Sequence, residues 1–259
     1  MTTMTSRALV SFVGAGPGDP ELITLKALRR LREADAVIHD RLIPREVLDE
    51  VRVGAEVIDV GKAPGRPCAG QGHINWMIVD AARRHRRVVR LKGGDPGIFG
   101  RLAEEVDAVR TAGLAFEIVP GVTAATAAAA RAGISLTERG RASTVILATG
   151  TSQGGAPPDD LDWDFLARVE GTLVFYMPVA SLDAITSALT VLGRDAREPS
   201  LIVEGAGTCD ERVIAARLGE IADRAREAQL RSPALFITGP TVAAASVPLA
   251  VRRVLAATG

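Results

Sequence analysis

Four polar side chains stand in or beside turns of this chain, and their types suit proton transfer and the binding of carboxylates: Asp40, Arg101, Glu104 and Arg139. A carboxylate can accept a proton from a reacting group, and an arginine can bind a carboxylate through two parallel hydrogen bonds. The same residues also suit ordinary structural roles. Asp40 would then cap a strand end, and Arg139 would be solvated. Arg101, Glu104 and Glu105 would share a solvated helix face.

A first glycine-rich segment, residues 14–20 (GAGPGDP), follows an apolar run and opens a helical pattern. A dinucleotide-binding fingerprint, GxGxxG, would require glycine at position 19, where Asp19 stands. Its carboxylate would repel a pyrophosphate, and Pro17 and Pro20 lack the backbone amide that phosphate binding uses. The segment therefore disfavours a nicotinamide or flavin cofactor. It predicts either a tight turn capped by Asp19 or a loop that another ligand approaches.

A second glycine-rich segment, residues 90–101 (RLKGGDPGIFGR), begins at the end of another apolar run. Gly93 and Gly94 lack side chains, so a ligand could approach the main chain there. Asp95 adds an acceptor for hydroxyl or ammonium groups. Because open α/β sheets bind ligands at the carboxyl ends of their strands, this segment is a candidate binding loop. The alternative interpretation is a plain turn.

The composition disfavours several classes of function. Among 259 residues, 31 basic and 31 acidic side chains cancel, which argues against a nucleic-acid or anionic-membrane partner. Cys68 and Cys209 lie far apart, and His39, His73 and His85 lack ligand spacing, so we expect neither a disulfide framework nor a metal site. Hydrolase, P-loop and zinc-protease motifs are absent from the sequence. The charge balance favours a small-molecule partner. Because the cysteines are few and no stretch is apolar enough to span a membrane, we expect a cytoplasmic protein.

Apolar runs rich in β-branched residues alternate with helical patterns along the chain, which predicts α/β layering. In the first half, strands are expected at residues 9–13, 36–39, 56–60, 88–91 and 116–119, and helices at 19–34, 45–51, 71–84 and 101–112. In the second half, an alanine-rich helix at 124–132 precedes strands at 143–149, 172–177, 200–204, 212–215 and 234–238. We predict two α/β domains, residues 1–119 and 120–259, with a hinge at Pro120-Gly121.

Taken in order, segments of this chain resemble the tetrapyrrole methyltransferase family, and the resemblance runs from Val10 to Gly239. The segments that carry it are VGAGPGDPELITLKA at 13–27, HDRLIP at 39–44, GK at 61–62, QGHIN at 71–75, VVRLKGGDPGIFGR at 88–101, VPGVTAA at 119–125, GISLTERG at 133–140, TLVFYM at 172–177 and SPALFITG at 232–239. Each segment is weak alone, but their joint order is specific. The RLKGGDP string is most similar to the members that methylate uroporphyrinogen III.

The resemblance implies a homodimer of two-domain α/β chains that bind a ligand in the cleft between the domains, unlike Rossmann-type methyltransferases. It implies S-adenosylmethionine as methyl donor, no metal, and methylation of uroporphyrinogen III at C2 and C7 to precorrin-2, for sirohaem, cobalamin or haem d1 synthesis. By matching positions, the donor would contact Pro17, Gly93, Gly94, Asp95, Ile98, Thr123, Ala124, Met177 and Ala206. The positions that the family uses for substrate binding or proton handling match Arg101, Glu104, Asp40 and Arg139.

The implied chemistry suits these residue types. The sulfonium methyl group is already electrophilic, so the protein has mainly to place a pyrrole carbon in line with it. Attack by that carbon leaves a cationic adduct that must lose a proton, for which Asp40, Glu104 and, less easily, Arg101 are candidate bases. The acetate and propionate groups of the substrate would pair with Arg101 and Arg139.

A few positions depart from the family pattern. Gly97 replaces an aromatic residue, Leu102-Ala103 replaces two glycines, and Glu138 and Thr151 replace histidines. A carboxylate at Glu138 could neutralise Arg139 or repel a polyanionic substrate. Three alternatives therefore stay open: the same fold and donor with a later precorrin or a non-tetrapyrrole acceptor, a binding protein without turnover, and a nicotinamide oxidoreductase.

Overall fold

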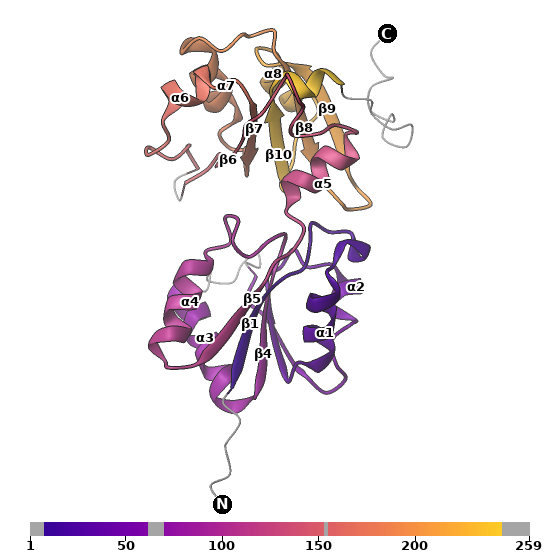
Figure 1. The fold of residues 1–259 in the computed structure, drawn as a ribbon, viewed down its shortest axis with the longest axis vertical. Coiled ribbons are helices and arrows are strands. Elements are labelled where there is room, and N and C mark those ends of the chain that lie inside the picture. Colours follow the sequence, from indigo (N-terminus) through magenta and orange to yellow (C-terminus); the bar gives the residue numbers. More distant parts are fainter. Residues whose placement is uncertain (1–7, 62–69, 153–154, 245–259) are drawn as a thin grey trace, which may run out of the picture. The chain divides into compact units, whose positions relative to one another are not determined.

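The computed structural model describes residues 8–61, 70–152 and 155–244, so Lys62 and Cys68 lie outside the described residues. The chain divides into two compact units. Unit 1 ends at Thr123, and unit 2 begins at Ala124. Each unit holds one five-stranded sheet covered by helices (Figure 1). The predicted fold class, two α/β units, is confirmed, and the sequence prediction had set the boundary between residues 119 and 120.

The sheet of unit 1 is wholly parallel, with the strand order β3-β2-β4-β1-β5. Its strands are β1 (Leu9–Gly14), β2 (Ala36–His39), β3 (Glu56–Asp59), β4 (Arg87–Lys92) and β5 (Ala115–Val119). All five predicted strands are confirmed, because none of their ends differs by more than one residue. Parallel strands bring all their carboxyl ends to one edge, so the segments that follow them meet there.

Helices cover both faces of this sheet (Figure 1). One face packs apolar residues against α1 (Leu25–Glu33) and α2 (Arg45–Leu48). The other face packs against α3 (Gln71–Arg84) and α4 (Leu102–Thr111). Side chains alternate between the faces along each strand, so Val88 of β4 lies on the α3/α4 face and Val89 on the α1/α2 face.

One continuous helix from Asp19 to about Ala34 was expected, and this prediction is wrong. A short 3-10 helix, η1 (Pro20–Leu22), comes first, and the Asp19 side chain accepts a hydrogen bond from the Glu21 amide at 2.9 Å. The chain is then extended, and α1 begins only where the Thr24 hydroxyl accepts a second capping bond. Two capping side chains thus divide the segment into two elements.

The sheet of unit 2 is mixed, with the strand order β6-β7-β10-β8-β9. Its strands are β6 (Val145–Thr149), β7 (Thr172–Tyr176), β8 (Pro199–Glu204), β9 (Arg212–Arg217) and β10 (Ala234–Thr238). Only β6 and β7 pair in parallel among these described strands, and the other three pairings are antiparallel. The carboxyl ends of β6 and β7 therefore share an edge.

The alanine-rich α5 (Ala124–Arg131) packs on one face of this sheet, where small side chains allow close approach. The other face packs against α6 (Trp163–Arg168), α7 (Leu182–Val191) and α8 (Ile221–Glu227). A 3-10 helix, η2 (Pro240–Ala244), ends the described chain. Across the described ranges, every helix is too short or too polar to cross a membrane.

Candidate active site

In unit 1 the predicted site residues follow strands that end at one edge of the sheet. Asp40 directly follows β2, and the segment from Gly93 to Asp95 directly follows β4. Thr123 lies a few residues beyond β5, and Pro17 beyond β1. The parallel topology, rather than closeness in sequence, brings these residues to a common edge.

Three glycines at this edge hold neighbouring loops together. A Cβ built at Gly14 would lie 2.5 Å from the Gly94 carbonyl oxygen and 2.7 Å from the Gly121 nitrogen, and one at Gly121 would clash with the same oxygen. The Gly94 amide also donates to the Gly16 carbonyl at 2.7 Å. The chain's own backbone therefore takes up the space beside Gly94, and any side chain here would force the loops apart.

Gly93 differs from its neighbour Gly94. It is exposed, and a Cβ built on it would meet nothing within 4 Å. Pro17 and Ile98, the other predicted donor contacts in these loops, are partly exposed. The sequence predicted open space beside the main chain at Gly93 and Gly94. The structure shows such space at Gly93.

The Asp95 carboxylate braces the loops at this edge. Oδ1 accepts a hydrogen bond from the Gly97 amide at 2.7 Å, and Oδ2 accepts one from the Gly121 amide at 3.0 Å. Both oxygens are therefore engaged by the main chain. Gly97 replaces the aromatic residue that the family carries, and its amide closes the Asp95 turn.

Arg101 and Glu104 form a pair at the start of α4. Arg101 Nε lies 2.8 Å from Glu104 Oε1, and Arg101 NH2 lies 2.7 Å from Glu104 Oε2. The hydrogen bond from Arg101 holds the pKa of Glu104 below its ordinary value. Arg101 has a φ of 55° and Phe99 one of 51°, which L-residues adopt at a cost. Both side chains of the pair are about half exposed, 49% and 50%, so an incoming carboxylate can compete for the guanidinium.

Below this edge lies a buried ionic cluster that the sequence analysis missed. Arg90 NH2 lies 2.5 Å from Asp40 Oδ1, and Arg90 Nε lies 3.0 Å from Glu105 Oε1. Lys92 Nζ contacts the two Glu105 oxygens at 3.0 and 2.9 Å. Burial lowers the pKa of Lys92 despite these contacts. The available signal was the pattern RVVRLK, in which Arg90 and Lys92 interrupt one face of an otherwise apolar strand.

Glu105 does not lie on a solvated helix face, so that interpretation of the α4 carboxylates is wrong for this residue. Its relative exposure is 0%, because α4 turns it onto the sheet toward β4. The Gln71 amide also donates to it at 3.3 Å, and Asn75 donates to the Glu104 carbonyl. Glu105 therefore ties α3, α4 and β4 together beneath the site.

In unit 2 the predicted donor contacts lie on two loops. Met177 follows β7, has a φ of 55°, and is 48% exposed. The Thr151 hydroxyl donates to the Met177 carbonyl at 2.7 Å, so this departure from the family pattern holds Met177 in place. Ala206 follows β8 in a loop where the Gly207 amide donates to Glu211 at 2.9 Å. Ala124 begins α5 and is partly buried.

Arg139 lies exposed in the turn that precedes β6. The adjacent Glu138 does not pair with it. A Glu138 oxygen instead lies 3.2 Å from Arg141 NH1, across a turn closed by backbone bonds to Ala142. Of the two effects considered for Glu138, neutralising Arg139 or repelling a polyanionic substrate, the structure shows neither directly; it shows that this carboxylate pairs with Arg141.

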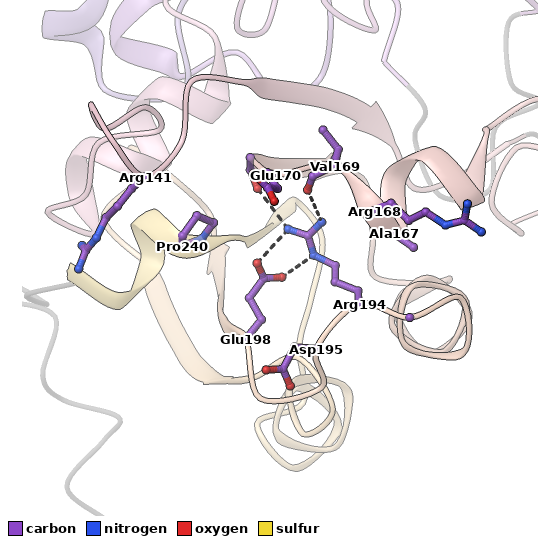
Figure 2. A pocket seen from close by; sticks show the side chains of 11 residues that line it. Arg141, Ala167, Arg168, Val169, Glu170, Arg194, Asp195, Glu198 and Pro240 are labelled. Carbon is purple, nitrogen blue, oxygen red and sulfur yellow. Dashed lines mark hydrogen bonds and ion pairs between the residues drawn. The ribbon is translucent and has the colours of Figure 1, made fainter.

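A hollow of about 430 Å³ in unit 2 is lined by Arg194, Glu198 and their neighbours (Figure 2). The Arg194 guanidinium donates to the carbonyls of Leu166 at 3.0 Å and Gly171 at 3.2 Å, and it pairs with Glu198. Because the Arg194 guanidinium already binds backbone carbonyls and Glu198, we do not assign this hollow as the site. Among the described residues, no cluster of three metal-ligating side chains occurs.

Comparisons with known proteins agree with this arrangement. The model of the tetrapyrrole (corrin/porphyrin) methylases matches residues 9–222. The chain belongs to this family. The resemblance seen in the sequence is thus confirmed, and the fold of each unit agrees with that of solved family members.

Among solved structures, a uroporphyrin-III C-methyltransferase from Thermus thermophilus, complexed with S-adenyl homocysteine, is 44% identical with a TM-score of 0.79. The match covers 91% of this chain and 99% of that one. A cobalt precorrin-4 methyltransferase of cobalamin biosynthesis has a TM-score of 0.81 at 28% identity, covering 90% and 95% of the two chains.

Curated relatives include siroheme synthases. That of Pseudoalteromonas atlantica is 44% identical over 233 residues, or 90% of this chain and 50% of the relative. Siroheme synthase 3 of Aeromonas hydrophila subsp. hydrophila is 45% identical over 90% of this chain and 49% of its own length. The chain therefore spans about half the length of the curated relatives it matches.

Proposed function

We propose that this tetrapyrrole methylase transfers methyl groups from S-adenosylmethionine to C2 and C7 of uroporphyrinogen III, giving precorrin-2. The observation that carries the proposal is the 44% identity that extends over 99% of the Thermus thermophilus uroporphyrin-III methyltransferase chain. The charged edge of unit 1 supports it, because it offers the Arg101 guanidinium to a substrate with many carboxylates and the Asp40 carboxylate as a base. Only this methylation, and not the activity of a whole siroheme synthase, is proposed.

The residues present fit a methyl donor of this kind. Gly93 leaves its main chain open, and the partly exposed Ile98 and Met177 offer apolar contacts for an adenosyl group. We propose that the donor contacts the matched residues of unit 1, namely Pro17, Gly93, Gly94, Asp95, Ile98 and Thr123, and those of unit 2, namely Ala124, Met177 and Ala206. Asp95 would act here by bracing the loop, since both its oxygens accept backbone amides. When bound, S-adenosylmethionine supplies an electrophilic methyl group.

We propose that Arg101 and Arg139 bind substrate carboxylates. Arg101 would exchange its exposed partner Glu104 for a substrate acetate or propionate group, which costs little because water screens an exposed ion pair. Arg139 is exposed, and Glu138 is engaged elsewhere. Both arginines are therefore accessible to an anionic ligand.

We propose Asp40 as the base that removes a proton from the methylated pyrrole. Its side chain is 37% exposed, and Arg90 binds only its Oδ1. In the described part of the chain, Oδ2 accepts no hydrogen bond and can face a ligand. Glu104 is the weaker candidate, because its hydrogen bond from Arg101 lowers its pKa and so its affinity for a proton.

The deciding experiment is an anaerobic incubation of the purified chain with S-adenosylmethionine and enzymatically generated uroporphyrinogen III, followed by absorbance and mass spectrometry. A product heavier by two methyl groups is expected. Binding of S-adenosylhomocysteine without such a product would reject uroporphyrinogen III and redirect the proposal to another acceptor. Absence of both binding and turnover would reject the donor as well.

We further propose that the chain acts in the cytoplasm as a homodimer. The support is the family resemblance together with the sparse cysteine usage of the sequence. Light scattering on the purified protein tests the dimer, for which twice the 27.1 kDa chain mass is expected.

A further inference from the structure

Arg90 is a buried arginine whose guanidinium has more than one kind of partner. It is 2% exposed and lies on the α3/α4 face of β4. NH1 donates to the Leu91 carbonyl at 3.1 Å, Nε donates to Glu105 at 3.0 Å, and NH2 reaches Asp40 at 2.5 Å. The arginine therefore links a carboxylate of the core to a carboxylate of the edge.

The charges of this cluster balance only when Asp40 is included. Arg90, Lys92 and Glu105 together carry one excess positive charge, and the Asp40 carboxylate offsets it. The three buried side chains are at most 4% exposed, whereas that of Asp40 is 37% exposed. Asp40 is thus the one partly exposed charged group among the four residues of this cluster.

Burying such ions is costly, and well-packed apolar residues often stabilise a core as well or better. A purely structural arginine would be expected to place its donors on carbonyls and on a carboxylate equally buried. Arg90 instead commits one end of its guanidinium to an exposed carboxylate at the edge of the site. The Nε side of the guanidinium is fixed by Glu105 of α4. Glu105 also contacts Lys92 of β4 and Gln71 of α3.

We propose that Arg90 is a positioning residue, which Glu105 holds in place and which orients the Asp40 carboxylate toward the tetrapyrrole. The guanidinium binds Oδ1 and so limits the rotation of the carboxyl group, whose Oδ2 accepts no hydrogen bond from the described residues. This inference rests on the proposed function, in which Asp40 handles the proton. Lys92 balances Glu105 and is not required to touch Asp40.

The test is a double-mutant cycle on turnover with Arg90→Lys, Asp40→Asn and the double variant of the full chain. A lysine keeps the charge, but it cannot bridge both carboxylates with a planar fork. Misplacing a catalytic group by about 1 Å can cost about a hundredfold, so we expect Arg90→Lys to lower kcat by about tenfold to a hundredfold. S-adenosylhomocysteine affinity, measured by calorimetry, should stay at the wild-type value.

The double variant should turn over within about threefold of Asp40→Asn alone, because Arg90 acts through Asp40. Multiplicative losses would overturn the proposal, since they would mean that the two residues act independently. Wild-type kcat in either single variant would also overturn it while the proposed function stands. A wild-type chain without turnover would reject the proposed function and this inference with it.

Two further variants separate positioning from folding. Arg194→Lys alters an arginine of similar burial in unit 2 and should lower the thermal midpoint while kcat, measured below that midpoint, stays unchanged. Should Arg90→Lys fail to fold, Arg90→Met replaces it in the cycle. That variant leaves the Lys92–Glu105 pair balanced and Asp40 free to hydrate, and we expect the same lack of additivity with Asp40→Asn.

Discussion

Arg90 of unit 1 and Arg194 of unit 2 are both buried and both pair with a glutamate, yet they end on different partners. Arg194 donates to the carbonyls of the segment that leads from α6 to β7 and pairs with Glu198, which is 16% exposed (Figure 2). Arg90 also donates to carbonyls, those of Leu91 at 3.1 Å and Ile38 at 3.5 Å, but it places another donor on Asp40, whose side chain is 37% exposed. This contact with an exposed carboxylate is the feature on which the proposed positioning role of Arg90 rests.

The largest effect expected from this comparison is on stability. Arg194→Met removes the ion pair of the mostly buried Glu198, which keeps the hydroxyl hydrogen bond from Thr238, and the donor to the carbonyls of Leu166 and Gly171, so it should cost about 3–5 kcal/mol of unfolding free energy. Arg90→Met should cost less, because Lys92 still pairs with Glu105. Chemical denaturation of the two variants checks the order, and the reverse order would break the comparison.

The interlocked glycines of unit 1 give the next effect. Gly121→Ala places a methyl group against the Gly94 carbonyl, and such overpacking costs about 1–3 kcal/mol. Gly93→Ala is the matched control, because its methyl group would enter open space. We expect Gly93→Ala to keep wild-type stability and to weaken S-adenosylhomocysteine binding. Equal stability losses in both variants would contradict the difference between these glycines.

Arg101 and Arg141 sharpen the comparison at the surface, since each pairs with a glutamate three residues away and each is about half exposed. Arg101→Lys should lower turnover about tenfold, or about 1.4 kcal/mol of barrier, because one ammonium cannot replace a fork on a substrate carboxylate. Donor affinity should not change. Arg141→Lys should leave kcat and KM as they are, and steady-state kinetics on both variants decides.

A smaller effect is expected at the edge of unit 2. Thr151→Val removes the hydrogen bond to the Met177 carbonyl at nearly constant volume, a loss of about 1 kcal/mol. If Met177 contacts the donor, S-adenosylhomocysteine affinity should fall about fivefold, as read by calorimetry. Thr190→Val, which removes a hydroxyl bond inside α7, serves as control and should leave affinity unchanged.

The last prediction concerns acid dependence, and it belongs to unit 1. Hydrogen bonds from Arg30, and further contacts with Lys26 and Ser11, lower the pKa of Glu117 from 4.5 to about 2. The stability from this ionised carboxylate is therefore present above pH 4.5 and is lost as the pH falls toward 2. Denaturation at pH 6 and pH 3 should show a smaller acid loss for Glu117→Gln than for wild type. An identical loss of stability in Glu117→Gln and in the wild type would contradict this role of the Glu117 carboxylate.

Much of the fold could be predicted from the sequence, because strand and helix patterns are local. The five strands of unit 1 and the α/β layering follow from runs of β-branched residues between helical periods. The break before α1 was missed, since a capping residue at Asp19 does not reveal a second one at Thr24. The helices α6 to α8 were not assigned individually.

Only part of the candidate site could be predicted from the sequence. Ordered motifs identified Gly93, Asp95 and Arg101 as a loop of interest, but not what each does. That Asp95 binds two amides depends on where Gly121 arrives after β5, which no local pattern specifies. Likewise, the pairing of Glu138 with Arg141 depends on the shape of one turn.

By itself, the sequence determined the strands, the α/β class and the family, because periodicity and motif order are properties of the chain. Tertiary structure alone decided that Gly94 packs against backbone while Gly93 stays open, and that Glu105 is buried while Glu104 is not. The physical reason is that burial depends on which surface a helix or loop packs against. Adjacent residues of the same type can therefore have opposite roles.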